Sequence, residues 1–534
     1  MRTKIAVLIS VIVFSCFSGK TQNKSFTSLL PIVYLNTNGQ VIPDEPKITA
    51  QLEIAWKGNG QSNSTSDPRD HFSGSIGIEL RGSTSQSFPK KAYGFELRNN
   101  DGEGVDFPLL GLPEEEDWIL YAPYSDKSLM RNVLTFTLAN QMSDTYASRC
   151  RFVELFLNNE YAGVYVLMEK IKRDKNRVNI AKLKEDDILG EDLTGGYIIK
   201  IDKLTGSGGD GWLSVFTNSR GSNTYYQYEY PKYDEIQPVQ KEYIHNYVDD
   251  FEQALYYQRH GENDGYQNYI NPETFYDYVI LNELSKNIDG YRLSTFLNKD
   301  KNGKLNAGPI WDYNLAFGNA DYYDGWQTSE IVIEQDYGEV PFWWRKLLSD
   351  SVFTNPMRCR WEELRETALV KENIFGIIDS LTTYLGGAVD RNFERWPVLS
   401  QKLWPNYYVG NTYANEINWL KDWIGSRLTQ LDLILPGTCV KSGIGDITDN
   451  GVTLSFYPNP FQSKLFLKII SDASLEYELN IFNSGGSLLR NMKLQVEVGS
   501  NSIDLSMPEL QKGIYFYRVT QNGTELSSGK LIKL

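Results

Sequence analysis

Hydrophobic residues follow two different periods along the first four hundred or so positions. Several short stretches rich in β-branched and aromatic residues alternate apolar and polar positions, which is typical of strands. They are LPIVYLN (30–36), ITAQLEIAW (48–56), GSIGIELRG (74–82), KAYGFELR (91–98), FVELFLN (152–158), AGVYVLME (162–169) and GGYIIKID (195–202). Apolar residues at helical spacing predict helices at 127–141, 242–258, 273–286, 343–366 and 412–431. The pattern predicts an α+β fold.

The pattern changes after the last predicted helix. Residues 437–451, GTCVKSGIGDITDNG, are small, polar and rich in glycine, which predicts a linker. Residues 452–534 have almost no helical period, and their short strand-like stretches are separated by Gly, Asn and Pro turns. This second region is therefore expected to be a small all-β sandwich.

The start of the chain has the pattern of an export signal. Arg2 and Lys4 precede the apolar run IAVLISVIVF, and polar residues follow from Ser15, so residues 1–18 are expected to be a signal peptide. The run is too short for a membrane-spanning helix, which needs about 20 apolar residues. Cys16 leaves lipid attachment open as an alternative. No later segment is long and apolar enough to span a membrane, so we expect an exported protein without a transmembrane span.

Composition and charge exclude several functions. The 534 residues include 53 Lys and Arg against 68 Asp and Glu, a net charge of −15, which argues against nucleic acid as a partner. Three scattered histidines argue against a multi-histidine zinc site and favour a carboxylate as any general base. The four cysteines lack CxxC spacing, and without Cys16 they allow at most one disulfide, whose pairing the sequence does not indicate.

Two aspartates follow a helix and a hairpin in a way that suggests chemistry. Asp289 lies just past the end of the helix predicted after Pro272. Two short strands around the Asn302-Gly303 turn follow, and the second is expected to end at Asp312, with Asn314 two positions further on. A hairpin returns the chain to its start, so both carboxylates can face one pocket. Protein kinases use this order, one aspartate accepting a proton and the other binding Mg²⁺. The alternative is that the two aspartates only end a helix and a strand.

Three further stretches place charged groups in the same region of the chain. Arg81 and Lys91 flank a loop of small hydroxylated residues that could hold phosphate, although a solvated hairpin explains it as well. Arg131 lies in a predicted helix and either reaches a phosphate or carboxylate or belongs to a capped surface helix. Glu169 ends a predicted buried strand and so could sit at the rim of a cleft.

The C-terminal region resembles the sorting domain of the type IX secretion system of Bacteroidetes. Its three landmarks are YPNPF (457–461), GIYFYRV (513–519) and SGKLIKL (528–534). The resemblance implies that the type IX machinery is a partner and that the protein is secreted or lies at the cell surface.

Residues 26–436 resemble the spore-coat-H (CotH) family of atypical kinases. The matching motifs are LPIVYLN, RGSTSQSFPKKAYGFEL, DWILYAPYSDKSLMRN, AGVYVLMEKI, NIDGY and GPIWDYNLAFG. The resemblance implies an atypical protein-kinase-like domain that uses ATP and Mg²⁺, with Asp289 as the catalytic aspartate and Asp312, with Asn314, as the metal ligand. It also places Arg81, Lys91, Arg131 and Glu169 in shared motifs, as candidate cofactor-binding residues.

Two positions depart from the family pattern. Ser294 stands where many members have Asn, and Asn314 stands where many have Asp. Both changes weaken the expected metal ligands.

Three functions remain. The leading hypothesis is phosphorylation of Ser or Thr hydroxyls on a protein substrate. A catalytically degenerate surface-binding or adhesion protein is the alternative, because ATP is scarce outside the cell. A glycoside hydrolase using paired carboxylates is a third, weaker possibility.

Overall fold

The computed structural model describes residues 26–204, 210–261, 263–335, 340–439, and 452–533 without 458, 460, 462–464, 472, 506, 508 and 509. The chain divides into two compact units, Met1–Gly437 and Thr438–Leu534. The expected signal peptide at 1–18 and most of the expected linker, 440–451, lie outside the described residues.

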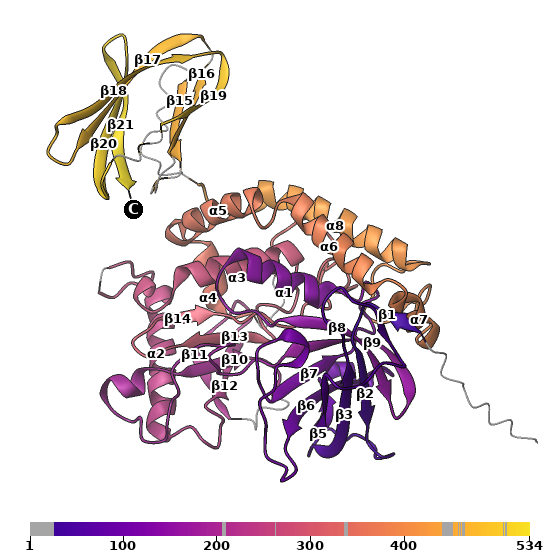
Figure 1. The fold of residues 1–534 in the computed structure, drawn as a ribbon. Coiled ribbons are helices and arrows are strands. Elements are labelled where there is room, and N and C mark those ends of the chain that lie inside the picture. Colours follow the sequence, from indigo (N-terminus) through magenta and orange to yellow (C-terminus); the bar gives the residue numbers. More distant parts are fainter. Residues whose placement is uncertain are drawn as a thin grey trace, which may run out of the picture. The chain divides into compact units, whose positions relative to one another are not determined.

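A closed barrel forms the first half of the larger unit (Figure 1). Its strand order is β2-β3-β5-β6-β7-β9-β8, and β2 closes it by pairing in parallel with β8. The strands are β2 (Ile32–Asn36), β3 (Ile48–Ala55), β5 (Phe72–Arg81), β6 (Ala92–Arg98), β7 (Asp117–Tyr121), β8 (Cys150–Leu157) and β9 (Glu160–Glu169). Alternating apolar side chains such as Ile76, Ile78 and Leu120 fill the interior. A short ladder joins β1 (Thr27–Ser28), before the barrel strands, to β4 (Asn63–Ser64), between β3 and β5.

A second, antiparallel sheet has the order β11-β12-β10-β13-β14. Its strands are β10 (Tyr197–Ile201), β11 (Gly211–Thr217), β12 (Asn223–Tyr230), β13 (Thr295–Lys299) and β14 (Leu305–Ala307). The sheet thus combines strands from before and after the long helical segment 238–285. Because β10 pairs with β13, the chain near residue 200 lies beside the chain near residue 295.

The helices of the larger unit are α1 (Arg131–Met142), α2 (Pro238–Tyr256), α3 (Pro272–Ser285), α4 (Phe342–Leu348), α5 (Ser351–Glu366), α6 (Lys371–Leu385), α7 (Ala388–Arg395) and α8 (Tyr413–Ile434). Of these, α2 contacts β11 and α3 contacts β14 of the second sheet, whereas α7 contacts β9 of the barrel. Helix α3 carries buried residues on every side and contacts α1, α5 and α8. A helix that is apolar all round belongs in the middle of a core, so α3 is the centre of this part of the unit.

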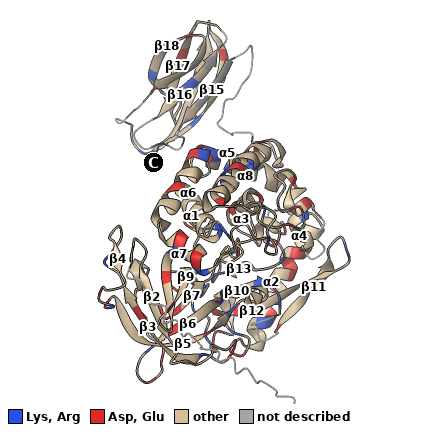
Figure 2. Cartoon of the chain, turned by 90° about the vertical axis from the view of Figure 1, so that its right-hand side faces the viewer, with Lys and Arg blue, Asp and Glu red and all other residues tan. Residues whose placement is uncertain are grey.

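Short 3₁₀ turns connect several elements. They lie at Thr84–Ser87, Leu109–Gly111, Gly190–Thr194, Tyr266–Asn268 and Val332–Glu334. Acidic and basic side chains are mixed over the helices and strands of the larger unit (Figure 2). No helix among the described residues combines the length and apolar composition needed to cross a membrane.

The smaller unit consists of two antiparallel sheets around a core of its own, which includes Leu467, Leu479 and Val519. One sheet has the order β15-β16-β19 and the other β18-β17-β20-β21. The strands are β15 (Val452–Tyr457), β16 (Phe466–Ser471), β17 (Leu475–Asn483), β18 (Leu488–Val496), β19 (Gly499–Asp504), β20 (Gly513–Gln521) and β21 (Thr524–Lys533).

The structure corrects two predicted helices. The single helix expected at 343–366 is two helices, because the side chain of Asp350 accepts a hydrogen bond from the Val352 amide at 3.0 Å and starts α5 anew. Helix α1 begins at Arg131 rather than 127, with the Asp126 carboxylate accepting from the Arg131 amide at 2.9 Å. The α+β prediction holds, but the sequence pattern did not predict β11, β12, α6 or α7.

The cysteines of the described residues agree with the limit of one disulfide. Cys359 and Cys439 are disulfide-bonded, and Cys150 is a free thiol. Burial raises the pKa of the Cys150 thiol, so it remains protonated at neutral pH.

A buried ion pair joins α8 to the end of α3. Arg427 and Glu283 are both fully buried, and the guanidinium lies 3.2 Å from the carboxylate. The same carboxylate accepts from the Val332 amide at 2.8 Å, the Ile333 amide at 3.3 Å and the Tyr291 hydroxyl at 2.9 Å. Burial raises the pKa of Glu283, which Arg427 and these donors oppose. One carboxylate thereby fixes α8, the turn after α3 and the segment near residue 332.

We predict that Arg427→Met lowers the free energy of unfolding by about 3–5 kcal/mol, because it leaves Glu283 buried without its partner. The measurement is the midpoint of urea unfolding followed by tryptophan fluorescence. Lys421→Met is the control, since it breaks a partly exposed pair with Asp379 and should cost less than about 1 kcal/mol. Equal effects of the two substitutions would contradict the prediction.

Candidate functional site

The turn after α3 and the following hairpin form the framework of the site. Helix α3 ends at Ser285, and Lys286 adopts a left-handed conformation with φ 45° that turns the chain toward Asp289. Strands β13 and β14 pair as the predicted hairpin, but β14 ends at Ala307 instead of Asp312. The reason is local, because Gly308 has φ 112° and Pro309 has no amide to donate to a ladder.

The segment that carries Asp312 is held by the neighbouring helices. Asp312 itself has φ 63°, a left-handed conformation that costs a non-glycine residue about 1–3 kcal/mol and persists only where its surroundings impose it. The Tyr313 amide donates to Asn132 Oδ1 at 2.6 Å, and Arg131 Nε donates to the Ala316 carbonyl at 3.0 Å. Helix α1 therefore fixes the backbone on the C-terminal side of Asp312.

Three carboxylates lie near one another at this point. The pKa of Asp312 is raised to about 7, first because surrounding protein atoms withdraw it from water and then because Asp289 and Asp202 add negative charge. Lys203 and Arg81 oppose the rise. The residue as a whole is nevertheless exposed to solvent, so the buried carboxyl lies close to the surface. Asp312 is thus accessible to a ligand from solution, and the neighbouring carboxylates disfavour its negatively charged form.

Asp289 is held by a cation of its own turn. Its Oδ1 lies 2.6 Å from Arg292, and its side chain is 20% exposed. Arg292 also lies over the ring of Tyr323, with 5.5 Å between the guanidinium carbon and the ring centroid. The carboxylate is therefore oriented but accessible.

Asp202 and Lys203 belong to this site, although sequence reasoning did not single them out. They follow β10, and Asp202 Oδ2 accepts from Ser294 Oγ at 3.4 Å. Lys203 Nζ donates to Thr84 Oγ1 at 3.1 Å. The strand GGYIIKID was predicted, but no local signal indicates that its end lies beside the turn after Asp289.

The two cations expected to neutralise phosphate have different surroundings. Arg81, at the end of β5, acts electrostatically on Asp312, and its guanidinium carbon lies 5.8 Å from the ring centroid of Trp311. Lys91 Nζ donates to the Gln86 carbonyl at 2.6 Å, within its own loop. Arg81 therefore lies at the carboxylate site, whereas Lys91 stabilises the loop.

Arg131 and Glu169 are held by internal partners. Arg131 is buried at the start of α1 and lies 2.6 Å from Asp126. Glu169, at the end of β9, accepts from Arg149 Nε at 2.9 Å and Nη2 at 2.7 Å. These contacts give both residues a structural role. Their expected part in cofactor binding stays a prediction.

Asn314 offers an oxygen that lacks a donor. Its Oδ1 is buried and has no hydrogen-bond partner among the residues that the structure describes. An unpaired buried acceptor is costly, and a bound cation satisfies it as well as a donor does. Asp312 lies two positions before Asn314 in the chain, and a carboxylate and an amide oxygen are ligands suited to a hard divalent cation such as Mg²⁺.

A separate acidic cluster is already neutralised. Glu115, Glu116 and Asp117 form the one group of three carboxylates in the described part of the chain whose ligand oxygens all lie within 4.8 Å of one another. Lys172 Nζ lies 3.0 Å, 2.8 Å and 3.0 Å from their oxygens. Its ammonium occupies the position that a metal ion would need.

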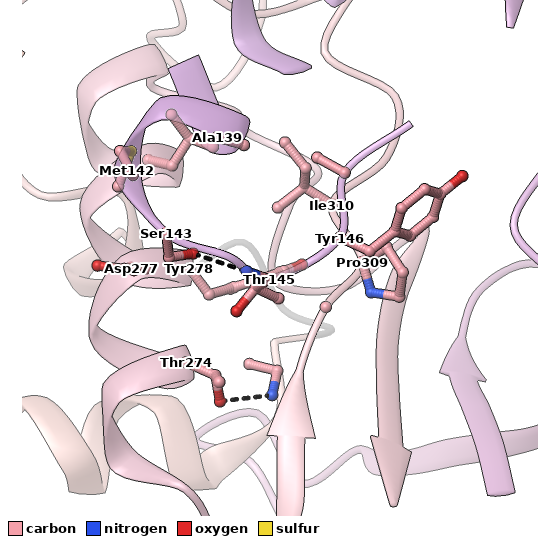
Figure 3. A pocket seen from close by; sticks show the side chains of 14 residues that line it. Ala139, Met142, Ser143, Thr145, Tyr146, Thr274, Asp277, Tyr278, Pro309 and Ile310 are labelled. Atoms are coloured by element: carbon pink, nitrogen blue, oxygen red, sulfur yellow. Dashed lines mark hydrogen bonds between the residues drawn. The ribbon is translucent and has the colours of Figure 1, made fainter. Parts of the chain in front are cut away.

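An apolar pocket lies beside the segment that leads to Asp312 (Figure 3). It is lined by the end of α1, the Ser143–Ala147 turn, α3 and Ala307–Ile310. Its one carboxylate, Asp277, is bound by Arg360 at 2.8 Å. Neither Asp289 nor Asp312 lines it, so the candidate site is elsewhere.

Comparison with known families identifies both parts of the chain. A family model described as CotH kinase protein matches residues 78–431. The chain belongs to the CotH kinase family. A second family model, described as a secretion system C-terminal sorting domain, matches residues 455–533. This domain directs export by the type IX system, which places this CotH family member at the cell surface or outside the cell.

Other comparisons add little. No curated protein matches the chain. Among solved structures, dimeric latent PorU from Porphyromonas gingivalis matches at 18% identity and a TM-score of 0.15. The match covers 18% of this chain and 10% of PorU. The chain thus spans a small part of that protein's length.

We predict that the elevated pKa of Asp312 makes stability depend on pH. The folded protein holds this proton more tightly than the unfolded chain does, so the free energy of unfolding should fall as pH rises from about 4 through 7. The measurement is the thermal midpoint in a divalent-free buffer series. Asp312→Asn should make the thermal midpoint less dependent on pH. Addition of about 10 mM Mg²⁺, a concentration chosen to saturate a weak site, should raise the wild-type thermal midpoint at pH 8. An unchanged pH profile in the variant would contradict the assignment.

Proposed function

We propose that this protein is an exported, Mg²⁺-dependent kinase that transfers the γ-phosphoryl group of ATP to Ser or Thr hydroxyls of a protein. Membership of the CotH kinase family supports the proposal. The observation that carries it is the electrostatic effect of Asp289 on Asp312, two positions before an Asn314 whose side-chain oxygen has no hydrogen-bond partner among the described residues. Phosphoryl transfer needs little else from a protein than positioning and charge stabilisation.

Asp289 is proposed as the catalytic base. It is partly exposed, so a substrate hydroxyl can reach it, and Arg292 fixes its Oδ1. The second carboxylate oxygen can then orient the hydroxyl and accept its proton as the new phosphate ester forms. A kinase-like fold for residues 26–436 is part of the same proposal.

Asp312 and Asn314 are proposed to hold the metal. When bound, Mg²⁺ supplies positive charge that neutralises the β- and γ-phosphates. The carboxylate of Asp312 must lose its proton to bind, which the raised pKa places near neutral pH. Arg81 is proposed to neutralise charge on the transferring group, while Lys91, Arg131 and Glu169 would maintain the loop and strands around the nucleotide.

A surface-binding protein without turnover remains the second candidate. Export places the protein where ATP is scarce, and exposed aromatic side chains lie close to the site. Tyr322 stacks on Trp404 with 6.1 Å between ring centroids, and Trp326 stacks on Tyr407 at 4.8 Å. Such rings are common in contact surfaces.

We predict that the purified protein transfers label from [γ-³²P]ATP to itself or to a Ser-rich acceptor in a Mg²⁺-dependent reaction. Asp289→Ala should reduce the rate by about 10²–10⁴, because it removes a general base. Asp312→Ala should abolish both the transfer and the Mg²⁺-dependent thermal shift given by ATP. Phosphoamino-acid analysis identifies the acceptor hydroxyl.

Asp324→Ala is a control, since this part-buried carboxylate accepts from Gln327 Nε2 at 3.1 Å and has no role in the proposed mechanism, so its loss should leave transfer nearly unchanged. A protein that binds ATP and Mg²⁺ but transfers no label, in wild type and variants alike, would favour the surface-binding alternative.

A further inference from the structure

We propose that the dipeptide Asp202-Lys203 at the end of β10 is part of the nucleotide site, Asp202 as a ligand to the divalent cation and Lys203 as a contact to the polyphosphate. The inference rests on the proposed function. It assigns a role to two residues that lie outside the motifs by which the sequence resembles its family.

The pairing of β10 with β13 fixes the position of Asp202. Ile201 lies opposite Thr295 in an antiparallel ladder, so the next pair along the two chains is Asp202 and Ser294. Their side chains meet at 3.4 Å. On the other side, Thr295 Oγ1 donates to the Gly290 carbonyl at 3.1 Å. The sheet itself thus holds Asp202 beside the turn that carries Asp289.

Asp202 compensates for a weak ligand. The Ser294 hydroxyl is a neutral and poor ligand for Mg²⁺, whereas the Asp202 carboxylate hydrogen-bonded to it is the kind of oxygen that Mg²⁺ prefers. Carboxylates gathered around Asp312 repel one another. A divalent cation bound by Asp202 and Asp312 would remove this repulsion.

Lys203 is placed for a different partner. Its exposed ammonium donates to Thr84 in the 3₁₀ turn Thr84–Ser87, which follows Arg81 along the chain. Lys203 and Arg81 both act electrostatically on Asp312. Phosphate oxygens next to the metal would therefore meet a positive group from the barrel and one from the sheet, an arrangement suited to a polyphosphate.

The alternative is a purely structural strand end. Asp202 Oδ1 accepts from the Lys203 amide at 2.8 Å, which by itself is a local turn contact. A structural aspartate would affect stability but not cation affinity, so binding measurements separate the two possibilities.

The test uses the full chain and two separate probes. Mn²⁺ alone, followed by electron paramagnetic resonance, reports the cation ligands, and Mg²⁺ with the ATP analogue AMP-PNP, followed by calorimetry, reports the phosphate contacts. Asp202→Asn should weaken Mn²⁺ binding by about tenfold or more. Lys203→Met should leave Mn²⁺ binding near wild type, weaken AMP-PNP binding and leave adenosine binding unchanged.

Matched controls come from the opposite end of the β10–β13 ladder, where Tyr197 lies opposite Lys299. Asp192 and Lys301 form an ion pair at 2.8 Å just beyond this end, so Asp192→Asn and Lys301→Met should change neither affinity. Circular dichroism and thermal midpoints establish that the variants fold, and Asp202→Glu should recover part of the Mn²⁺ affinity if Asp202→Asn proves unstable.

The outcomes separate this inference from the proposed function. Wild-type affinity for Mn²⁺ in Asp202→Asn, or for AMP-PNP in Lys203→Met, overturns the corresponding assignment even if the enzyme turns over. Loss of affinity in both variants supports the inference even if no label is transferred, a result that would count against the kinase activity alone. A wild-type protein that binds neither probe overturns both.

Discussion

The candidate site depends on a constraint buried beneath it, the single carboxylate of Glu283. It binds Arg427 of α8, two amides near residue 332 and the hydroxyl of Tyr291, two positions after Asp289. The turn that presents Asp289 is therefore anchored to the interior, not only to the surface. A catalytic carboxylate needs such support, because a general base contributes little unless it is held within hydrogen-bond reach of its proton.

Two kinds of charge balance occur in this unit. The acidic group at residues 115–117 is neutralised within the protein by Lys172 together with Lys47, Lys170 and Arg177. Burial and then the charges of Asp289 and Asp202 raise the pKa of the Asp312 carboxyl to about 7, and Lys203 and Arg81 compensate only in part. A site that retains excess negative charge beside an unpaired oxygen is suited to a cation from solution. The contrast also shows why the number of acidic residues in a cluster does not by itself identify a metal site.

Local signals explain what the sequence could predict. Pro272 and the Asn302-Gly303 turn define a helix and a hairpin within about forty residues, which sufficed to expect Asp289 and Asp312 near each other. The role of Asp202 depends on β10 pairing with a strand over ninety positions away, which no local pattern encodes. Likewise, whether Lys91 and Arg131 point to a ligand or to internal carbonyls is decided by packing, so their type and spacing alone could not distinguish the two cases.

The separate hydrophobic cores of the two units have a consequence for maturation. The core residues around α3 and in the barrel end at Leu435, while the sorting domain buries its own set beginning at Leu454. If the sorting domain were removed by proteolysis after export, the hydrophobic core of the larger unit, which supports the aspartates, would therefore remain buried. A processed form would retain the core that holds the proposed site.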